Sequence, residues 1–241
     1  MADLIFEDPR LVAIYDVFDG QRTDLDPYVS MVTELRAKSV LDLGCGTGCF
    51  ARLLGSLGIE VTALEPARAS LDYARSQPNA NFVRWILGDA TNIPPRVIDV
   101  AFMTGNVAQV FLSDQAWNEA LLCIHKALRP GGHLVFEVRD PVKTAWLDWT
   151  REKTHTSLDI PEIGRVTSWC EVTDVSKELV SFRWTYVFES GGEVIISDST
   201  LRFRERKAIE QSLMKAGYLI CEVREAPDRP GKEFVFIART N

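Results

Sequence analysis

Residues 40–48, VLDLGCGTG, decide the fold of this chain. The segment begins as a short apolar strand and ends in a glycine-rich turn, and the residues after it have the apolar spacing of a helix. Glycine adopts positive φ at no steric cost and lets a ligand approach the main chain. A strand, a glycine turn and a helix in this order are typical of a first β-α unit that binds a ligand at its turn.

Further short apolar runs follow at regular intervals. We expect strands over 61–64, 97–103 and 133–138, and helices over 48–57, 67–76 and 114–128. This alternation predicts an α/β fold, in which a doubly wound parallel sheet has helices on both faces. Pro130, Gly131 and Gly132 predict the end of the helix that begins at Asp114.

The pattern changes after Arg139. Runs over 165–172, 180–189 and 194–204 read as antiparallel strands, because short polar or glycine turns join them. The strand at 180–189 alternates aromatic residues with more polar ones, so one face of this insertion should be aromatic. A helix from about Arg206 and two strands over 218–225 and 233–240 complete the chain.

The composition narrows the class of protein. The 241 residues contain 27 Lys and Arg against 34 Asp and Glu, a net charge of −7, which disfavours a nucleic-acid partner. No apolar run approaches the roughly 20 residues of a membrane span, and the acidic N-terminus is unlike a signal peptide. We therefore expect a cytoplasmic protein, with no membrane partner and with its five cysteines reduced.

Glu65 supplies the second sign of a ligand site. It follows the strand at 61–64 and lies 21 residues after Gly44, the first glycine of the turn. A carboxylate at about this distance is typical of the residue that accepts both hydroxyls of a ribose, so we expect an adenosine compound. The turn is G-x-G-x-G rather than the dinucleotide fingerprint, which disfavours NAD and FAD. A nicotinamide oxidoreductase stays an alternative.

Five motifs together resemble those of the class I S-adenosylmethionine (SAM) dependent methyltransferases. They are VLDLGCGTG at 40–48, Glu65-Pro66, Gly88-Asp89-Ala90, DVAFMTGN at 99–106 and LRPGGHLV at 128–135. The resemblance spans roughly residues 35–140, and the ending at 206–240 is similar to the reversed last strand of that fold. It implies a Rossmann-like, mostly parallel sheet with a reversed last strand, plus an antiparallel β insertion.

The resemblance also implies how the chain is organised. Residues 1–36 would form an N-terminal helical lid and residues 37–140 the SAM-binding core. Residues 141–204 would form the antiparallel insertion that caps the substrate, and residues 205–241 would complete the core sheet.

The residues that the resemblance implies for cofactor binding form two groups, one at each end of SAM. Toward its methionine end, Asp42 would compensate the ammonium and sulfonium charges from beneath the turn. The other residues expected there are Gly44, Cys45, Gly46, Thr104, Gly105 and Asn106. Toward its adenosine end, Glu65 would hold the ribose and Pro66 would touch one face of the adenine. Asp89 and Ala90 would hydrogen-bond the adenine edge.

The residues after the fourth strand bear on the acceptor. Nucleic-acid amino-methyltransferases carry a [DNS]-P-P-[YF] element there, and metal-dependent catechol methyltransferases carry acidic ligands. This chain has Thr104-Gly105-Asn106 instead. The resemblance therefore implies a small-molecule acceptor, no nucleic acid and no metal.

Acceptor and catalytic residues are harder to assign from the sequence. Tyr15, Trp146, Arg183 and Arg202 are the residues that we expect to contact the acceptor. Because SAM carries an activated methyl group, a dedicated base is optional, and Tyr15, Asp140 and His155 are candidates without an assignment. We expect an N- or O-methyltransferase; the alternative is a regulatory protein that binds SAM or adenosine without turnover.

Overall fold

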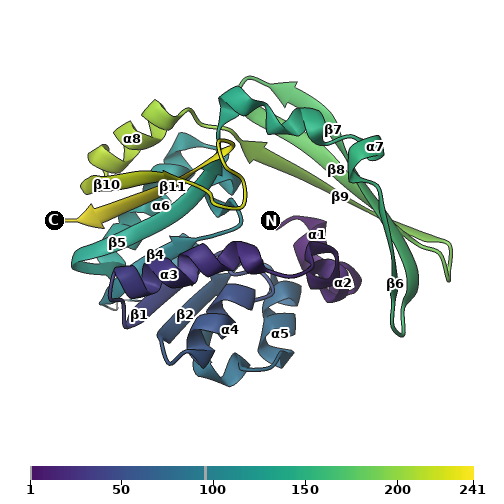
Figure 1. Ribbon diagram of the computed structural model, residues 1–241, viewed down its shortest axis with the longest axis horizontal. Helices are drawn as coiled ribbons and strands as arrows, with labels where there is room; N and C mark the ends of the chain where they lie inside the picture. Colours follow the sequence, from purple (N-terminus) through teal and green to yellow (C-terminus); the bar gives the residue numbers. More distant parts are fainter. Residues whose placement is uncertain (1, 95–96) are drawn as a thin grey trace.

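The chain forms two β-sheets with helices around and between them (Figure 1). The computed structural model describes residues 2–94 and 97–241. The larger sheet has seven strands in the order β10-β11-β5-β4-β1-β2-β3. They are β1 (Ser39–Leu43), β2 (Glu60–Glu65), β3 (Val83–Leu87), β4 (Ile98–Met103), β5 (Leu128–Arg139), β10 (Tyr218–Glu225) and β11 (Glu233–Thr240).

The direction of the strands confirms the predicted fold class. β1 pairs in parallel with β2 and β4, and β2–β3 and β4–β5 are parallel as well. β11 runs antiparallel to both β5 and β10, so the reversed last strand lies inside the sheet. The strand order changes direction at β1, which opens a crevice at the carboxyl ends of β1 and β4.

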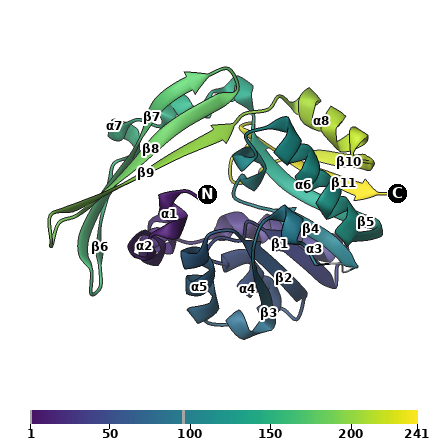
Figure 2. The same cartoon turned by 180° about the vertical axis from the view of Figure 1, so that it is seen from behind.

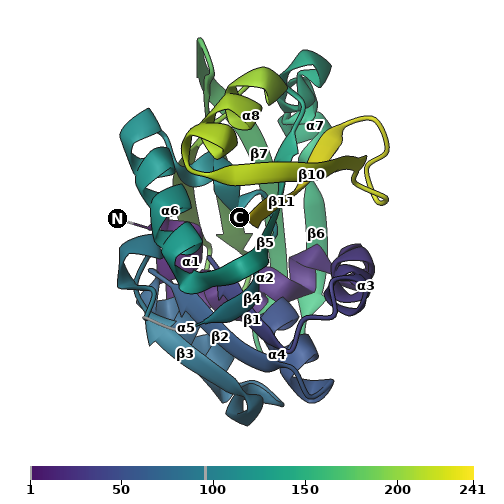
Figure 3. The same ribbon diagram turned by 90° about the vertical axis from the view of Figure 1, so that its left-hand side faces the viewer.

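Helices cover both faces of the larger sheet (Figures 2 and 3). α3 (Asp26–Glu34) and α4 (Cys49–Ser56) pack on the face that carries Val40 and Phe102. α6 (Asp114–Ala127) and α8 (Arg206–Lys215) pack on the face that carries Leu41 and Phe136. α5 (Arg68–Ser76) follows β2 and contacts β2 and β3. Because successive side chains of a strand point to opposite faces, the larger sheet contributes to two separate apolar layers, one on each face.

The second sheet is the antiparallel insertion and arches away from the core (Figure 1). Its order is β6-β7-β8-β9, with β6 (Thr156–Ile160), β7 (Gly164–Ser176), β8 (Leu179–Phe188) and β9 (Glu193–Arg202). Short α7 (Arg151–Thr154) precedes it. On its concave side, Tyr186, Phe188 and Ile195 are buried, as expected from the aromatic alternation of β8.

The N-terminal helices lie between the two sheets (Figures 1 and 2). α1 (Leu4–Glu7) and α2 (Pro9–Asp19) bury Ile5, Leu11 and Ile14 against the antiparallel sheet. Asp8 caps α2, because its side chain accepts a hydrogen bond from the Arg10 N–H and proline occupies the first turn. These helices therefore share an apolar core with the insertion.

Two strands were not predicted, β3 and β6, and both lie at sheet edges. Edge strands keep polar side chains in contact with solvent, so their apolar runs are interrupted. Arg84 in β3 is exposed, and in β6 only Ile160 is buried. No helix among the described residues is long and apolar enough to cross a membrane.

Candidate functional site

The glycine turn after β1 forms an open cradle at the crevice. The Gly44 and Cys45 N–H groups donate to the Leu64 carbonyl at 2.8 and 3.1 Å, so the turn bends over the end of β2. Gly44 and Gly46 have φ of +73° and +53°. A Cβ atom at Gly46 would meet nothing within 4 Å, which leaves the main chain accessible to a ligand.

Glu65 lies directly beside this turn. Its Oε2 accepts from the Gly46 N–H at 2.8 Å, and its Oε1 accepts from the Ala67 N–H at 2.9 Å. The side chain lines the main cavity, and burial raises its pKa. Each oxygen keeps a further lone pair, so the carboxylate can hold the turn and still accept hydroxyl donors.

Asp42 is buried beneath the turn, and neither of its carboxylate oxygens makes a hydrogen bond to the residues that the structure describes. Burial, together with the nearby negative charge of Glu65, raises the pKa of Asp42 to about 7. A buried carboxylate without a donor is costly, so this arrangement points to a positively charged partner above it. Such a partner fits the ammonium and sulfonium groups of SAM.

The residues expected at the adenine lie in an open groove of about 760 Å³ that adjoins the main cavity. Pro66 and Asp89 both line it, and Ala90 is buried behind them. Asp89 also caps a short helix, because its Oδ1 accepts from the N–H and the hydroxyl of Thr91. Its other oxygen makes no hydrogen bond to the described residues.

The loop after β4 is held from below by Glu137. Its Oε1 accepts from the N–H groups of Gly105 and Asn106 at 2.7 and 3.1 Å. Glu137 is buried, and burial together with the charge of Glu233 raises its pKa to about 7. Asn106 is also buried, and no described residue donates a hydrogen bond to its Oδ1. Thr104 and Gly105 line a smaller cavity of about 100 Å³ beside Cys45.

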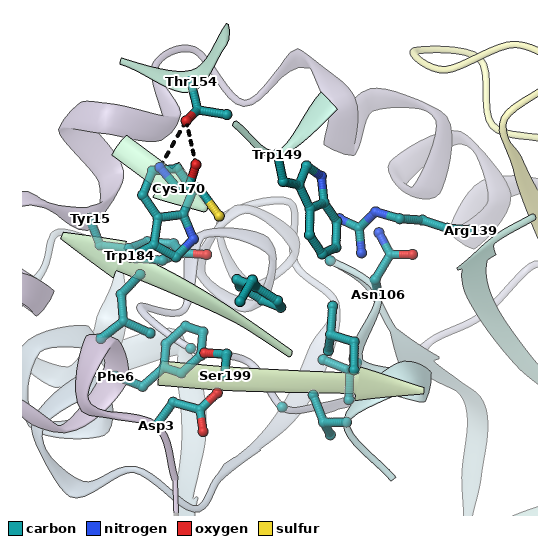
Figure 4. A pocket seen from close by; sticks show the side chains of 18 of the residues that line it. Asp3, Phe6, Tyr15, Asn106, Arg139, Trp149, Thr154, Cys170, Trp184 and Ser199 are labelled. Carbon is teal, nitrogen blue, oxygen red and sulfur yellow. Dashed lines mark hydrogen bonds between the residues drawn. The ribbon is translucent and has the colours of Figure 1, made fainter. Parts of the chain in front are cut away.

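The main cavity, of about 430 Å³, lies between the glycine turn, the N-terminal helices and the antiparallel sheet (Figure 4). Gly44, Gly46 and Glu65 lie at its core side. Aromatic side chains line much of the rest, and they are Phe6, Tyr15, Trp149, Phe182 and Trp184. This cavity therefore joins the cradle to an aromatic chamber.

A second, polar cavity of about 360 Å³ adjoins the first. The two share Tyr15, Gly105, Asn106 and Arg139. The charged residues that line the second cavity are Asp19, Arg22, Asp24, Glu137, Arg139, Asp228 and Arg229. Arg22 also reaches the small cavity beside the glycine turn, where a ligand carboxylate would find it.

Three of the expected acceptor residues lie away from these cavities. Trp146 packs against Phe203 with ring centroids 4.7 Å apart. Arg183 is exposed and pairs with Asp198, because alternation along β8 turns it to the face opposite Phe182 and Trp184. Arg202 pairs with Glu178 and Asp114, and it ties β9 to the start of α6. These three assignments are corrected.

Of the candidate bases, only Tyr15 lies at the cavity. Burial raises the pKa of its hydroxyl, which therefore stays protonated at neutral pH. Asp140 accepts from the Val142 N–H as the cap of a short helix, and exposed His155 stacks on Trp169. Neither residue lines the main cavity, so both are removed from the candidates.

Several contributors were missed because they come from distant parts of the sequence. Phe6 comes from α1, Arg139 from the end of β5, and Glu137 contacts a loop about 30 residues away. Asp16 of α2 accepts from the Thr47 hydroxyl at 2.6 Å and so ties α2 to the turn. The alternation of β8 was the signal for Phe182 and Trp184; the others carried no local signal.

Comparison with known proteins agrees with this geometry. Residues 40–132 match the family model described as a methyltransferase domain. A malonyl-[acyl-carrier protein] O-methyltransferase of Yersinia pestis is 40% identical over 99 residues, which is 40% of this chain and 35% of that protein. A cypemycin N-terminal methyltransferase of a Streptomyces species is 29% identical over 149 residues, covering 59% of this chain and 60% of that one. The chain thus spans from about a third to somewhat over half of these relatives.

Solved structures share the fold over nearly the whole chain. A SAM-dependent methyltransferase from Clostridium acetobutylicum superposes with a TM-score of 0.76 and 16% identity, over 96% of this chain and 98% of that one. An amino pentose methyltransferase from Micromonospora echinaspora gives 0.72 and 20% identity, over 95% of each chain. Residues 40–132 thus match a methyltransferase domain, and the whole chain has the fold of solved SAM-dependent methyltransferases.

Proposed function

We propose that this chain transfers a methyl group from SAM to a nitrogen or oxygen atom of a small-molecule acceptor. The observation that carries the proposal is Asp42, whose buried carboxylate lies beneath an open glycine cradle and has no hydrogen-bond donor within 2–94 and 97–241. The aromatic chamber opens onto the same cradle, so a second molecule can lie beside the cofactor. Proteins that only sense a nucleoside have no need of that second space.

The cofactor roles follow from the positions of the side chains. Asp42 would balance the positive charges of SAM, and Glu65 would accept its ribose hydroxyls. Gly44, Cys45 and Gly46 would line the methionine part, with Thr104, Gly105 and Asn106 closing over it. Pro66, Asp89 and Ala90 would contact the adenine from the adjoining groove.

The chain contributes alignment and exclusion of water rather than a strong base. SAM would supply an activated methyl group: its S–CH₃ bond would break as the bond to the acceptor formed, leaving a neutral thioether, and the proton of the acceptor would pass to water. Tyr15 and the loop at 104–106 flank the place where the two molecules would meet. Holding two reactants in line removes much of the entropic barrier.

The N-terminal residues 1–36 act in this proposal as a lid, and residues 141–204 as a substrate cap. The Ile5 N–H donates to the Ser197 hydroxyl, and the Ser70 hydroxyl donates to the Phe6 carbonyl. α1 therefore bridges the cap and the core directly over the main cavity. A covered cavity excludes water from the reacting atoms.

Calorimetry and a labelled-methyl assay together test the proposal. We expect S-adenosylhomocysteine (SAH) to bind, and Glu65→Ala to weaken it by at least about tenfold, since hydrogen bonds to a charged group contribute about 1.5–3 kcal/mol each. Glu60→Ala, at the other end of β2, is the matched control. A metabolite extract with methyl-labelled SAM should yield a labelled small molecule. Tight SAH binding without transfer to any extract component would favour the regulatory alternative.

A further inference from the structure

We infer that the acceptor is a flat, uncharged aromatic molecule that lies between the N-terminal helices and the antiparallel sheet. This inference rests on the proposed function, and it names the substrate class of the same site. Two features of the main cavity carry it: where its aromatic rings come from, and how its charges are already paired.

The rings approach the main cavity from two sides (Figure 4). Phe6 and Tyr15 come from α1 and α2 and contact each other with centroids 5.6 Å apart. Phe182 and Trp184 come from β8, and Trp149 packs against Phe182 with centroids 4.7 Å apart. A space bounded by rings on two sides favours a planar apolar guest, which can stack or meet ring edges on both.

The charges of the main cavity disfavour an anionic acceptor. Asp3 and Glu65 are the acidic residues that line it. Among the described lining residues the cation is Arg139, which lies 3.6 Å from Glu233, donates to Gln109 and sits over the Trp149 ring. Arg139 thus shares Glu233 with Arg229 and is already engaged. A carboxylate or phosphate entering the chamber would find no unpaired cation among the described lining residues and would lie near Asp3.

The polar atoms of the chamber can form one or two hydrogen bonds with an acceptor, fewer than a sugar would need. The Thr154 hydroxyl is already engaged with the main chain of Cys170, as Figure 4 shows. The Ser199 and Tyr15 side chains also line the cavity. A polyhydroxylated guest would leave most of its hydroxyls unpaired against rings, which is costly, whereas a single ring hydroxyl or amine would not.

The test compares two fluorescent coumarins and a sugar amine on the SAH-saturated protein, with the sugar amine measured by a chemical amine assay. Aminomethylcoumarin is flat and uncharged, aminomethylcoumarin acetate adds a carboxylate, and glucosamine is a polar amine. We expect the uncharged coumarin to bind at least about tenfold more tightly than the other two, by equilibrium dialysis. Trp184→Ala should weaken that binding by about tenfold or more and leave the SAH affinity unchanged.

Trp169→Ala is the matched control for the tryptophan. Trp169 precedes the cavity-lining Cys170 on β7, so it faces the other side of the sheet, where it stacks under Arg151. Its loss should leave coumarin binding within about twofold. Phe182→Ala gives a second test on the cavity side should Trp184→Ala fail to fold, as judged by thermal unfolding.

The outcomes separate this inference from the proposed function. Equal or tighter binding of the acetate or glucosamine would overturn the inference, as would no coumarin binding to protein that does bind SAH. Equal effects of Trp184→Ala and Trp169→Ala would also overturn it. Protein that does not bind SAH at all would overturn the proposed function, on which the inference depends.

Discussion

Asp42 shows how much a single buried residue can determine. Its carboxyl pKa is raised to about 7 by burial and by Glu65, so in the free protein it holds a proton well above the ordinary carboxyl range. A raised carboxyl pKa means that the folded chain binds more protons than the unfolded chain between about pH 4 and 7. The free protein therefore loses stability from this group as the pH rises through that window.

Binding of the cofactor should respond to pH in the opposite sense. Ionised Asp42 attracts the positive charges of SAM, so we expect the affinity to rise roughly tenfold between about pH 6 and 8. Calorimetry across this range measures it. Asp42→Asn should flatten the profile, while Glu137→Gln, which removes the other carboxyl with a pKa near 7, should retain it. A flat profile in the unmodified protein would contradict the role of Asp42.

Gly46 offers a second prediction at this scale. Its φ of +53° and the open space beside it mean that an added Cβ would strain the main chain and project toward the cavity. We expect Gly46→Ala to lower SAH affinity by at least about tenfold, while the positive φ costs about 1–2 kcal/mol of stability.

Gly58 provides the matched control for this strain. It has φ of +83°, also has nothing within 4 Å of its Cβ position, and lies in the turn before β2 rather than at the cavity. Gly58→Ala should therefore lose similar stability in chemical denaturation and keep its SAH affinity. Similar losses of affinity in both variants would show that strain alone explains the effect.

The N-terminal helix α2 is tied to the end of the glycine turn through a single side chain. Asp16 accepts from Thr47 at 2.6 Å and from the Cys49 thiol at 3.4 Å. Burial raises the pKa of that thiol, so it stays a donor at neutral pH. Movement of α2 and the conformation of the turn are therefore coupled by one carboxylate.

Hydrogen exchange tests this coupling. Asp16→Asn should speed exchange in residues 4–19 of the free protein and reduce the extra protection that SAH gives to 44–49. Asp26→Asn, on the exposed start of α3, removes a charge without touching the turn and should change neither. Uniformly high protection of residues 4–19 in every variant, unchanged by SAH, would mean that these helices are fixed and do not act as a lid.

Elements with strong local patterns were predictable, and those that depend on distant contacts were not. The strand and turn at 40–48 and the reversed ending at 206–240 lie as expected, because apolar periodicity and glycine turns act locally. Trp146 and Trp149 are three residues apart and both contact Phe203, yet of the two only Trp149 lines the cavity. The 3₁₀ helix that carries Trp146 ends at Asp148, so Trp149 does not continue its regular spacing. The sequence around Glu137 does not distinguish it from other strand residues, because its role depends on a contact with the distant loop at 105–106.

At the scale of the whole molecule, the apolar core on the larger sheet is separate from the apolar core between the N-terminal helices and the antiparallel sheet. Ile124 of α6 is buried in the layer on the larger sheet. Ile14 of α2 is equally buried, but against the antiparallel sheet. This second core joins segments separated by about 150 residues and holds α1 and α2 to the antiparallel sheet.

A cavity-forming substitution should have different effects in these two cores. Each isoleucine-to-alanine change at a fully buried site costs about 2–5 kcal/mol. We expect Ile124→Ala to lower the free energy of global unfolding. Ile14→Ala should instead speed hydrogen exchange mainly in residues 4–19 and 156–202, with smaller effects on β1 and β4. Identical exchange patterns in the two variants would show that the molecule unfolds as one unit.

The division between the two sheets has an evolutionary consequence. Asp42, Glu65 and the glycine turn belong to one sheet, while Phe182, Trp184 and Cys170 belong to the concave face of the other. Under the proposed function, substitutions on that second face would change which acceptor fits without altering the groups proposed to hold the methyl donor. Descendants of such a protein could then accept new molecules by exchanging a few cavity-lining side chains of β7, β8 and β9, and a library confined to those positions is the natural place to begin redesigning it.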